Sequence, residues 1–167
     1  PDANFKAYLV GNIDINTNGD AEIQVSEAAA FSRGISLSEM SISDLIGIEA
    51  FTALTYLDCG DIQLTSLDVT NNTALISLYC RNNKLKSIDV TNNTALTSLY
   101  CEDNKLTSLD VTKNTALLRL SCGYNKLKSI DVTNNTALTY LECDENKLRC
   151  VVGVPQGCKL EGAVICP

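Results

Sequence analysis

The chain contains no histidine among its 167 residues. It therefore lacks the commonest general base, the commonest metal ligand and the one side chain that ordinarily titrates between about pH 5 and 8. The sequence also has no nucleophile elbow, no phosphate-binding loop and no carboxylate pair in a recognisable catalytic setting. These absences predict a protein that is not an enzyme and needs no cofactor.

Long apolar runs are missing as well. No stretch approaches the roughly 18 apolar residues of a membrane span. The start at Pro1 shows no initiating methionine and no charged region that leads into an apolar one. We therefore expect no membrane insertion, and we expect any signal or lipid anchor to be absent from this chain.

Positive charge is scarce. The 13 basic residues face 20 acidic ones, and the net charge of −7 opposes binding to nucleic acid. The imbalance is local: residues 1–52 hold eight acidic and two basic residues, whereas residues 53–149 hold eleven and ten. A hydrophobic fraction of 45% with 20% charged residues is nevertheless typical of a folded domain.

A repeat of 21 residues fills the middle of the chain. Residues 53–73 read ALTYLDCGDIQLTSLDVTNNT, and residues 74–94, 95–115 and 116–136 follow the same pattern before ALTYLECDENKL at 137–148. Five of the eight cysteines occupy one position of this repeat: Cys59, Cys80, Cys101, Cys122 and Cys143. Repeats of this length indicate a solenoid in which each unit buries its apolar side chains against its neighbours.

The recurring string L-x-x-L-x-C-x-x-N-x-L resembles the leucine-rich repeat, and bacterial surface or secreted leucine-rich repeat proteins have similar 21-residue coils. The resemblance implies a leucine-rich repeat solenoid with a parallel β-sheet on its concave side. The repeat is too short for a convex helix, so an extended or 3₁₀ convex side is expected. Leu37 precedes Cys59 by close to one repeat length and continues the register upstream. Residues 33–149 therefore form about six coils, between an N-terminal cap at 1–32 and a C-terminal cap at 150–167.

The cysteines divide into two groups. Equivalent positions of neighbouring parallel strands lie about 4.8 Å apart with parallel Cα–Cβ vectors, which does not suit a disulfide, so the five repeat cysteines should be buried free thiols. The other three, Cys150, Cys158 and Cys166, are expected to form one disulfide, and the sequence leaves the pairing open. Val164-x-Cys166 mimics the Leu-x-Cys step of the coils, which would leave Cys150 and Cys158 to close a short loop.

The N-terminal cap should contain two short helices around a loop. Asp2 is a candidate N-cap, and a second helix is expected through residues 26–30. The loop follows the EF-hand frame, with side-chain ligands at positions 1, 3, 5 and 12 and the Glu22 carbonyl at position 7. Its candidate ligands are Asn16, Asn18, Asp20, Glu22 and Glu27. Asn at position 1 and Ala21 in place of glycine depart from the pattern, so the loop either binds calcium with millimolar-type affinity or is a turn without metal.

The variable positions between the fixed leucines should face the open side of the sheet. They carry most of the tyrosines, and tyrosine and arginine are enriched in interface hot spots. The candidate partner-binding residues are Tyr56, Asp58, Tyr79, Arg81, Tyr100, Glu102, Arg119, Tyr124, Tyr140 and Glu142. The alternative for Tyr79 and Tyr100 is that they stack and stiffen the sheet without binding anything.

Two charged columns follow the strand. Lys84, Lys105, Lys126 and Lys147 form one, and Lys86, Lys128 and Arg149 form an interrupted second. They are either a solvated rim or a docking strip for an anionic glycan. The column of Asp68, Asp89, Asp110 and Asp131 is expected to hydrogen-bond the TNNT turns that follow it.

The resemblance implies a protein-binding module on or outside a bacterial cell, for adhesion to a host or capture of a host protein. Binding of anionic or other host glycans, through the lysine columns or the tyrosine face, is the first alternative. A purely structural repeat segment of a larger surface protein is the second.

Overall fold

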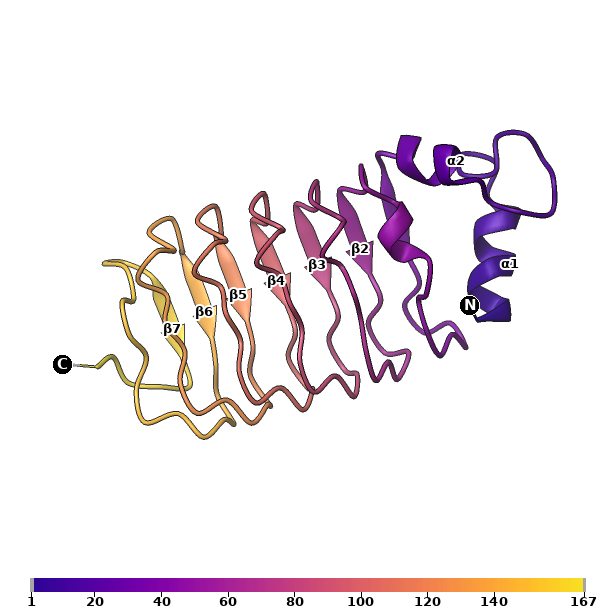
Figure 1. The fold of residues 1–167 in the computed structure, drawn as a ribbon. Coiled ribbons are helices and arrows are strands. Elements are labelled where there is room, and N and C mark those ends of the chain that lie inside the picture. The colour runs from indigo at the N-terminus through magenta and orange to yellow at the C-terminus, as the bar shows by residue number, and fades with distance from the viewer. Residues whose placement is uncertain (1, 167) are drawn as a thin grey trace.

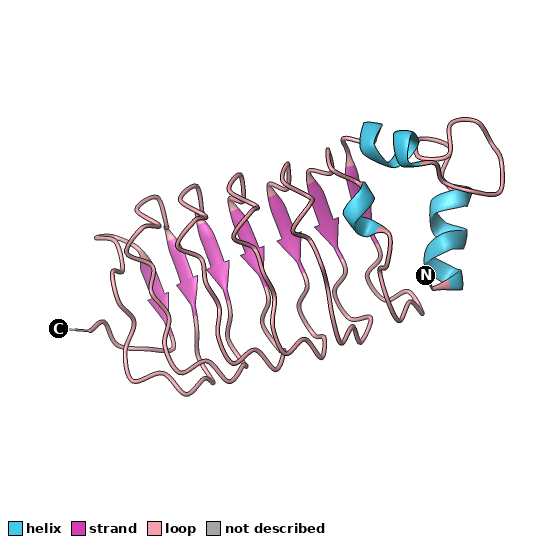
Figure 2. Cartoon of the chain, in the orientation of Figure 1, coloured by secondary structure: helices cyan, strands magenta, loops and turns pink. Residues whose placement is uncertain are grey.

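The computed structural model describes residues 2–166, and its seven short strands form one parallel sheet in the order of the sequence (Figure 1). A small helical unit precedes the sheet, and loops and turns make up most of the rest of each coil (Figure 2). The elements are α1 (Ala3–Gly11), α2 (Val25–Ala30), β1 (Gly34–Ser36), η1 (Ile48–Ala50), β2 (Tyr56–Asp58), β3 (Ser77–Tyr79), β4 (Ser98–Tyr100), β5 (Arg119–Ser121), β6 (Tyr140–Glu142) and β7 (Lys159–Glu161). The predicted leucine-rich repeat solenoid is therefore confirmed.

The register follows the repeat. The central leucines of neighbouring strands pair directly, as in Leu57 with Leu78 and Leu78 with Leu99. β1 joins the same series, because Ile35 lies opposite Leu57. The Leu37 amide donates to the Asp58 carbonyl, and Leu37 is fully buried, which confirms the upstream coil. Strands β1–β6 account for the six coils that the sequence predicts.

The five repeat cysteines are free, buried thiols, as predicted. Their thiols point toward the next coil: the Cys122 Sγ lies 3.4 Å from the Glu142 carbonyl oxygen, which accepts a weak hydrogen bond. Burial raises the pKa of the Cys80 thiol to about 12, so it stays protonated at neutral pH. The column therefore packs the core and offers no reactive thiolate.

Buried asparagines tie each coil to its neighbours. The Asn104 side-chain amide donates to the Cys80, Cys101 and Glu102 carbonyls at 2.9–3.2 Å, and its Oδ1 accepts from the Leu85 amide at 3.0 Å. The far side of the coil has a second asparagine of this kind. Asn93 is fully buried and donates to the Val69 and Asn72 carbonyls at 2.9 and 2.8 Å. These side-chain bonds supplement the backbone hydrogen bonds in coils that have little regular structure.

The aspartate column closes the turns on that far side, as predicted. The Asp89 carboxylate accepts from the Thr91 amide at 2.9 Å and from the Thr91 hydroxyl at 2.7 Å. Asp68 and Asp110 hold their turns with the same two bonds. These hydrogen bonds keep the pKa of each carboxyl below its ordinary value.

The C-terminal cap corrects one prediction. Val164 is 65% exposed and does not continue the core. The last strand is instead β7, whose Leu160 pairs with Leu141 after a coil slightly shorter than the repeat. Of the pairings that the sequence leaves open, the structure has Cys150–Cys166, with Cα atoms 5.0 Å apart, while Cys158 is free. The expectation of one disulfide among the three is confirmed, and the alternative Cys150–Cys158 loop is not formed.

The N-terminal cap covers one end of the solenoid. Asp2 caps α1 by accepting from the Asn4 and Phe5 amides, and Phe5 and Leu9 turn into the core. Phe31 and Phe51 meet edge to face at 6.2 Å and join the cap to the first coil. No helix within residues 2–166 has the length and apolar character needed to cross a membrane.

Candidate partner-binding face

The outward side chains of the seven strands form one surface, called here the strand face. Strands β1–β6 bury their central residue, β7 buries Leu160 in part, and the two flanking residues turn outward, since side chains alternate along a strand. The first outward column contains Gly34, Tyr56, Ser77, Ser98, Arg119, Tyr140 and Lys159. The second contains Ser36, Asp58, Tyr79, Tyr100, Ser121, Glu142 and Glu161.

Three tyrosines make a continuous aromatic ladder across this face. The ring centroids of Tyr56 and Tyr79 lie 5.4 Å apart at an interplanar angle of 71°, and those of Tyr79 and Tyr100 lie 4.7 Å apart at 53°. The predicted stacking of Tyr79 and Tyr100 is thus present. All three side chains remain half-buried, so the ladder keeps an open surface.

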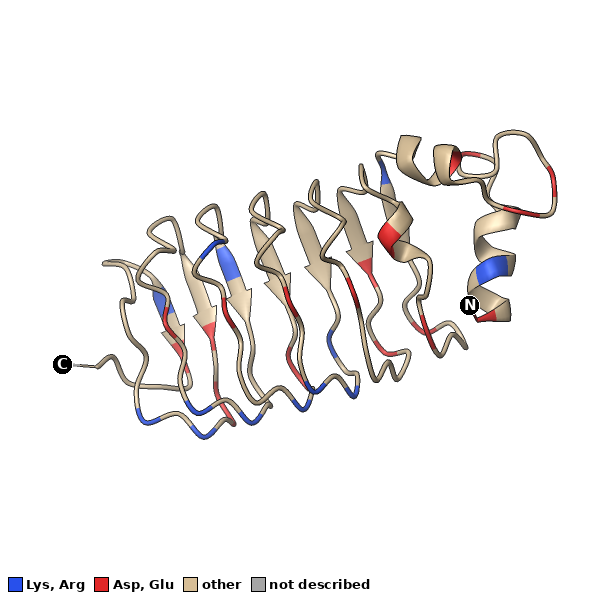
Figure 3. Ribbon diagram, in the orientation of Figure 1, with Lys and Arg blue, Asp and Glu red and all other residues tan. Residues whose placement is uncertain are grey.

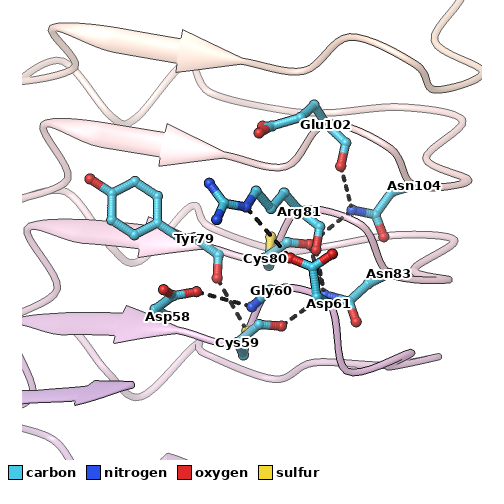
Figure 4. Close-up of polar contacts among 10 residues, drawn as sticks. All are labelled: Asp58, Cys59, Gly60, Asp61, Tyr79, Cys80, Arg81, Asn83, Glu102 and Asn104. Carbon is cyan, nitrogen blue, oxygen red and sulfur yellow. Dashed lines mark hydrogen bonds and ion pairs between the residues drawn. The ribbon is translucent and has the colours of Figure 1, made fainter. Parts of the chain in front are cut away.

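Arg81 lies beside this ladder, just beyond β3 (Figure 4). Its Nε is 3.8 Å from the Asp61 carboxylate, and the guanidinium lies over Gly60. A side chain at Gly60 would come within 3.2 Å of the Arg81 Cγ, so the glycine makes room for the arginine. Asp58 accepts from the Gly60 amide at 3.1 Å and fixes this corner.

The C-terminal end of the face is charged. Arg119 is exposed and has no ion pair within residues 2–166. The Lys159 Nζ lies 5.5 Å from the Tyr140 ring centroid and 2.6 Å from the Glu161 carboxylate, which also accepts from the Tyr140 hydroxyl at 3.0 Å. Tyr100, Arg119, Thr139, Tyr140 and Lys159 line a hollow of about 460 Å³. This hollow offers two aromatic rings and two cations to a ligand.

Carboxylates gather beside the hollow. Glu142 accepts a hydrogen bond from the Ser121 hydroxyl, and a side chain at Gly123 would collide with the carboxylates of Glu142 and Asp144. Burial raises the pKa of Glu102 and of Glu142, and the neighbouring Asp144 raises that of Glu142 further. The face therefore changes from aromatic at β2–β4 to mixed charge at β5–β7.

The structure brings most of the predicted site residues together. Seven of them lie on the strands: Tyr56, Asp58, Tyr79, Tyr100, Arg119, Tyr140 and Glu142. Arg81 and Glu102 come two residues after the ends of β3 and β4. Tyr124 lies apart, because it occupies the left-handed turn position (φ 51°) and is 51% exposed. Sequence reasoning missed Lys159 and Glu161 on β7. The triplet Lys159-Leu160-Glu161 repeats the polar-Leu-polar pattern of the other strands and was the signal available.

The predicted calcium loop is held together by its own hydrogen bonds. The Glu27 Oε1 accepts from the amide and hydroxyl of Thr17 at 2.8 Å, and its Oε2 accepts from the Gln24 amide at 3.1 Å. These bonds, that of Gln24 first, lower the pKa of Glu27. Asn16 is buried and donates to the Val10 and Asp20 carbonyls.

The remaining candidate ligands of the loop are also engaged. Asp20 accepts from the side chains of Asn18 and Gln24, and Glu22 pairs with Lys6 at 2.6 Å. Within residues 2–166 no group of three or more acidic or cysteine side chains is placed to hold a metal ion. The candidate ligands are thus bonded to one another and to backbone amides, and calcium binding stays a prediction.

Comparison with known proteins agrees with this architecture. A family model of leucine-rich repeats in two copies matches residues 73–113. No curated protein matches the sequence significantly. Among solved structures, the functional domain of InlJ from Listeria monocytogenes, which includes a cysteine ladder, is similar at 38% identity and a TM-score of 0.77. The match covers 90% of this chain and 36% of that one.

Two further structures share the fold. The internalin InlF of Listeria monocytogenes is 24% identical at a TM-score of 0.68, with 86% of this chain and 46% of that chain covered. A leucine-rich repeat protein of Leptospira interrogans is 16% identical at a TM-score of 0.63, with 75% and 41% covered. The chain thus spans less than half of each of these proteins. Its fold is an internalin-like leucine-rich repeat solenoid.

Proposed function

We propose that the chain is a non-enzymatic module that binds a protein through its strand face. Its similarity to InlJ and to an internalin supports a place on or outside a bacterial cell and a host protein as the partner. The role would be adhesion to the host or capture of a host protein. This proposal concerns the solenoid alone, since the chain covers 36% of the InlJ structure.

The observation that carries the proposal is the ladder of Tyr56, Tyr79 and Tyr100. Its rings contact one another at 5.4 and 4.7 Å, and each remains half-buried in the free chain. A stiff aromatic surface loses little side-chain entropy on binding, which is why tyrosine is frequent in interface hot spots. Arg81 beside the ladder adds a charged contact at its margin.

The size of the strand face limits what it can do alone. Seven strands at about 4.8 Å spacing present on the order of 500 Å² of sheet, below the roughly 800 Å² per partner of a stable interface. The loops that follow the strands must therefore contribute. Glu102 lies in such a loop just beyond β4, and Tyr124, in the turn after β5, is off the strands but exposed.

The test is a pull-down from host serum and cell-surface extract with two double variants. Tyr79→Ser with Tyr100→Ser removes the centre of the ladder, and Ser121 already occupies the same column in β5. Lys105→Ser with Lys126→Ser changes an exposed edge outside the face and is the matched control. A partner that binds the strand face is captured by the wild type and the control and is lost with the tyrosine variant.

Two outcomes would reject the proposal. Equal capture by all three proteins would show that the tyrosines only stiffen the sheet. No specific capture by any of them would favour a structural repeat segment of a larger protein. Thermal unfolding of each variant, measured in parallel, separates lost binding from lost folding.

A further inference from the structure

Seven cations line one edge of the solenoid, away from the strand face. They follow the buried asparagine turn of coils 3–6 and are all exposed. Figure 3 shows lysine and arginine gathered along this edge of the coils. The set, called here the lysine edge, contains Lys84, Lys86, Lys105, Lys126, Lys128, Lys147 and Arg149.

The backbone holds the lysine edge at a fixed pitch. The Lys84 amide donates to the Leu64 carbonyl at 2.8 Å, and those of Lys105 and Lys126 donate to the preceding coil at 2.9 and 2.8 Å. Lys147 continues the series at 2.9 Å. One hydrogen bond per coil keeps neighbouring lysines about 4.8 Å apart at their backbones. Like charges are thus held in a straight row although they repel one another.

These cations have no countercharge within the described residues. None of the seven forms an ion pair in residues 2–166, and only Lys84 has a side-chain hydrogen bond, to Gln63 at 2.9 Å. The aspartates that follow, such as Asp89, are occupied by their own threonines. This aspartate column forms no ion pair with the lysine edge within residues 2–166.

Carboxylates flank the lysine edge and restrict the shape of a partner. Asp103 and Glu145 precede Lys105 and Lys147 by two residues, and Asp89, Asp110 and Asp131 follow the edge. A broad anionic surface, such as a membrane or a DNA duplex, would meet these carboxylates together with the lysines. A single flexible chain can follow the row of cations between them.

We infer that the lysine edge binds a linear sulfated polysaccharide. The sulfate groups lie against successive lysines along the edge and displace their counterions. This site is separate from the strand face, so the chain can hold a sulfated glycan and a protein partner at the same time.

The net charge of −7 on the chain does not oppose binding of a sulfated glycan to the lysine edge. The six excess negative charges of residues 1–52 lie in the N-terminal cap and first coil, several coils from Lys105. Three to four coils at about 4.8 Å each exceed the Debye length of about 8 Å at physiological salt. The local charge of the edge therefore governs its encounter with an anion.

The experiment measures binding of a fluorescent heparin oligosaccharide by anisotropy at low and at physiological salt. Two variants make the same change in net charge at different places. Lys105→Glu with Lys126→Glu alters the lysine edge, whereas Lys6→Glu with Lys113→Glu alters the N-terminal cap and a turn outside both the lysine edge and the strand face. The wild type should bind with an affinity that falls steeply with salt. The edge variant should lose at least about tenfold in affinity and part of the salt dependence, and the control should lose less than about threefold.

Each other outcome overturns a part of the inference. No binding of heparin at low salt rejects the site, and an equal loss in both variants shows attraction by overall charge. Binding of unsulfated dextran rejects the role of sulfate. Binding of duplex DNA or anionic vesicles as tight as that of heparin rejects the restriction to a narrow chain. Circular dichroism of both variants confirms that they remain folded.

Discussion

The strand face differs from the far side of the coils, called here the turn side, in how much its residues vary from coil to coil. On the turn side, Asp89-Val90-Thr91-Asn92-Asn93 repeats almost unchanged from coil to coil, and its buried side chains have fixed hydrogen bonds. On the strand face, the second outward column changes from tyrosine to serine to glutamate. The constant side builds the coil, and the variable side is free to acquire a binding surface. Four predictions, each with its own substitutions, test this division.

The largest effect is expected for Asn93→Ala on the turn side. Asn93 is fully buried, and its loss removes the side-chain donor from the Val69 and Asn72 carbonyls, which keep one backbone amide donor each. Two lost hydrogen bonds at about 1 kcal/mol each, together with the void left by the shorter side chain, should lower the free energy of unfolding by about 2–3 kcal/mol in urea denaturation. Asn92→Ala is the control, because Asn92 is exposed and makes one bond of 3.2 Å, to Thr70. Similar losses in both variants would contradict the division.

A smaller, pH-dependent effect is expected for Asp89→Ala. Hydrogen bonds from Thr91 hold the pKa of this carboxyl below its ordinary value of 3.8. Its stabilisation is therefore present above about pH 4 and is lost as the pH falls through the lowered pKa. Thermal unfolding of the variant should differ from that of the wild type at pH 7 and converge with it in acid.

The control for this variant is Asp103→Asn. Asp103 is exposed at a left-handed position (φ 53°) that asparagine also tolerates, and its carboxylate accepts no hydrogen bond within residues 2–166. Its removal should leave thermal unfolding almost unchanged at either pH. A difference between the Asp89 variant and the wild type that persists in strong acid would mean that the carboxylate bonds do not close the turn.

On the strand face, the tyrosine ladder should contribute little to stability. Tyr79→Ser and Tyr100→Ser are combined in a double-mutant cycle, and a stacked pair couples by about 0.5–1.5 kcal/mol. Tyr56 and Tyr140 lie four coils apart and should show no coupling in the same measurement. A coupling as large as the Asn93 effect would place the ladder among the elements that build the fold.

The sequence predicts the repeated part of the fold well because each position recurs in the same environment. One coil is enough to assign Leu99 to the core, Cys101 to the packed column and Asn104 to the turn, and the period then places all equivalents. The stacking of Tyr79 and Tyr100 follows from their shared register. These predictions need no knowledge of distant contacts.

The caps were harder to predict because each residue there occurs once. The coil that leads into the last strand is shorter than the repeat, and the likeness of Val164-x-Cys166 to the Leu-x-Cys step pointed to Val164 instead of Leu160 as the next core position. In the N-terminal loop the EF-hand frame predicts Glu27 as a calcium ligand, which stays a prediction. It could not show that backbone amides of Gln24 and Asn18 occupy the carboxylate.

The smallest effect is expected for Glu142→Gln on the strand face, and its sign is opposite to that of Asp89→Ala. Burial, and then the neighbouring Asp144, raise the pKa of Glu142 above its ordinary value of 4.5. The folded chain therefore binds this proton more tightly than the unfolded chain, and stability falls as the pH rises from 4.5 through the raised pKa. The glutamine keeps an acceptor for the Ser121 hydroxyl but has no charge to bury. Glu142→Gln should therefore unfold at a slightly higher temperature than the wild type at pH 7 and at the same temperature near pH 4.

Glu161→Gln supplies the matched comparison, one strand further along the same column. Lys159 and the Tyr140 hydroxyl hold the pKa of Glu161 below its ordinary value, so this carboxylate stabilises the fold at neutral pH and stops doing so in acid. The variant should unfold at a lower temperature than the wild type at pH 7. If both glutamine variants shift thermal unfolding in the same direction at neutral pH, the strand face does not contain the two opposed carboxylates described here. The strand face would then resemble the turn side, where equivalent residues of successive coils behave alike.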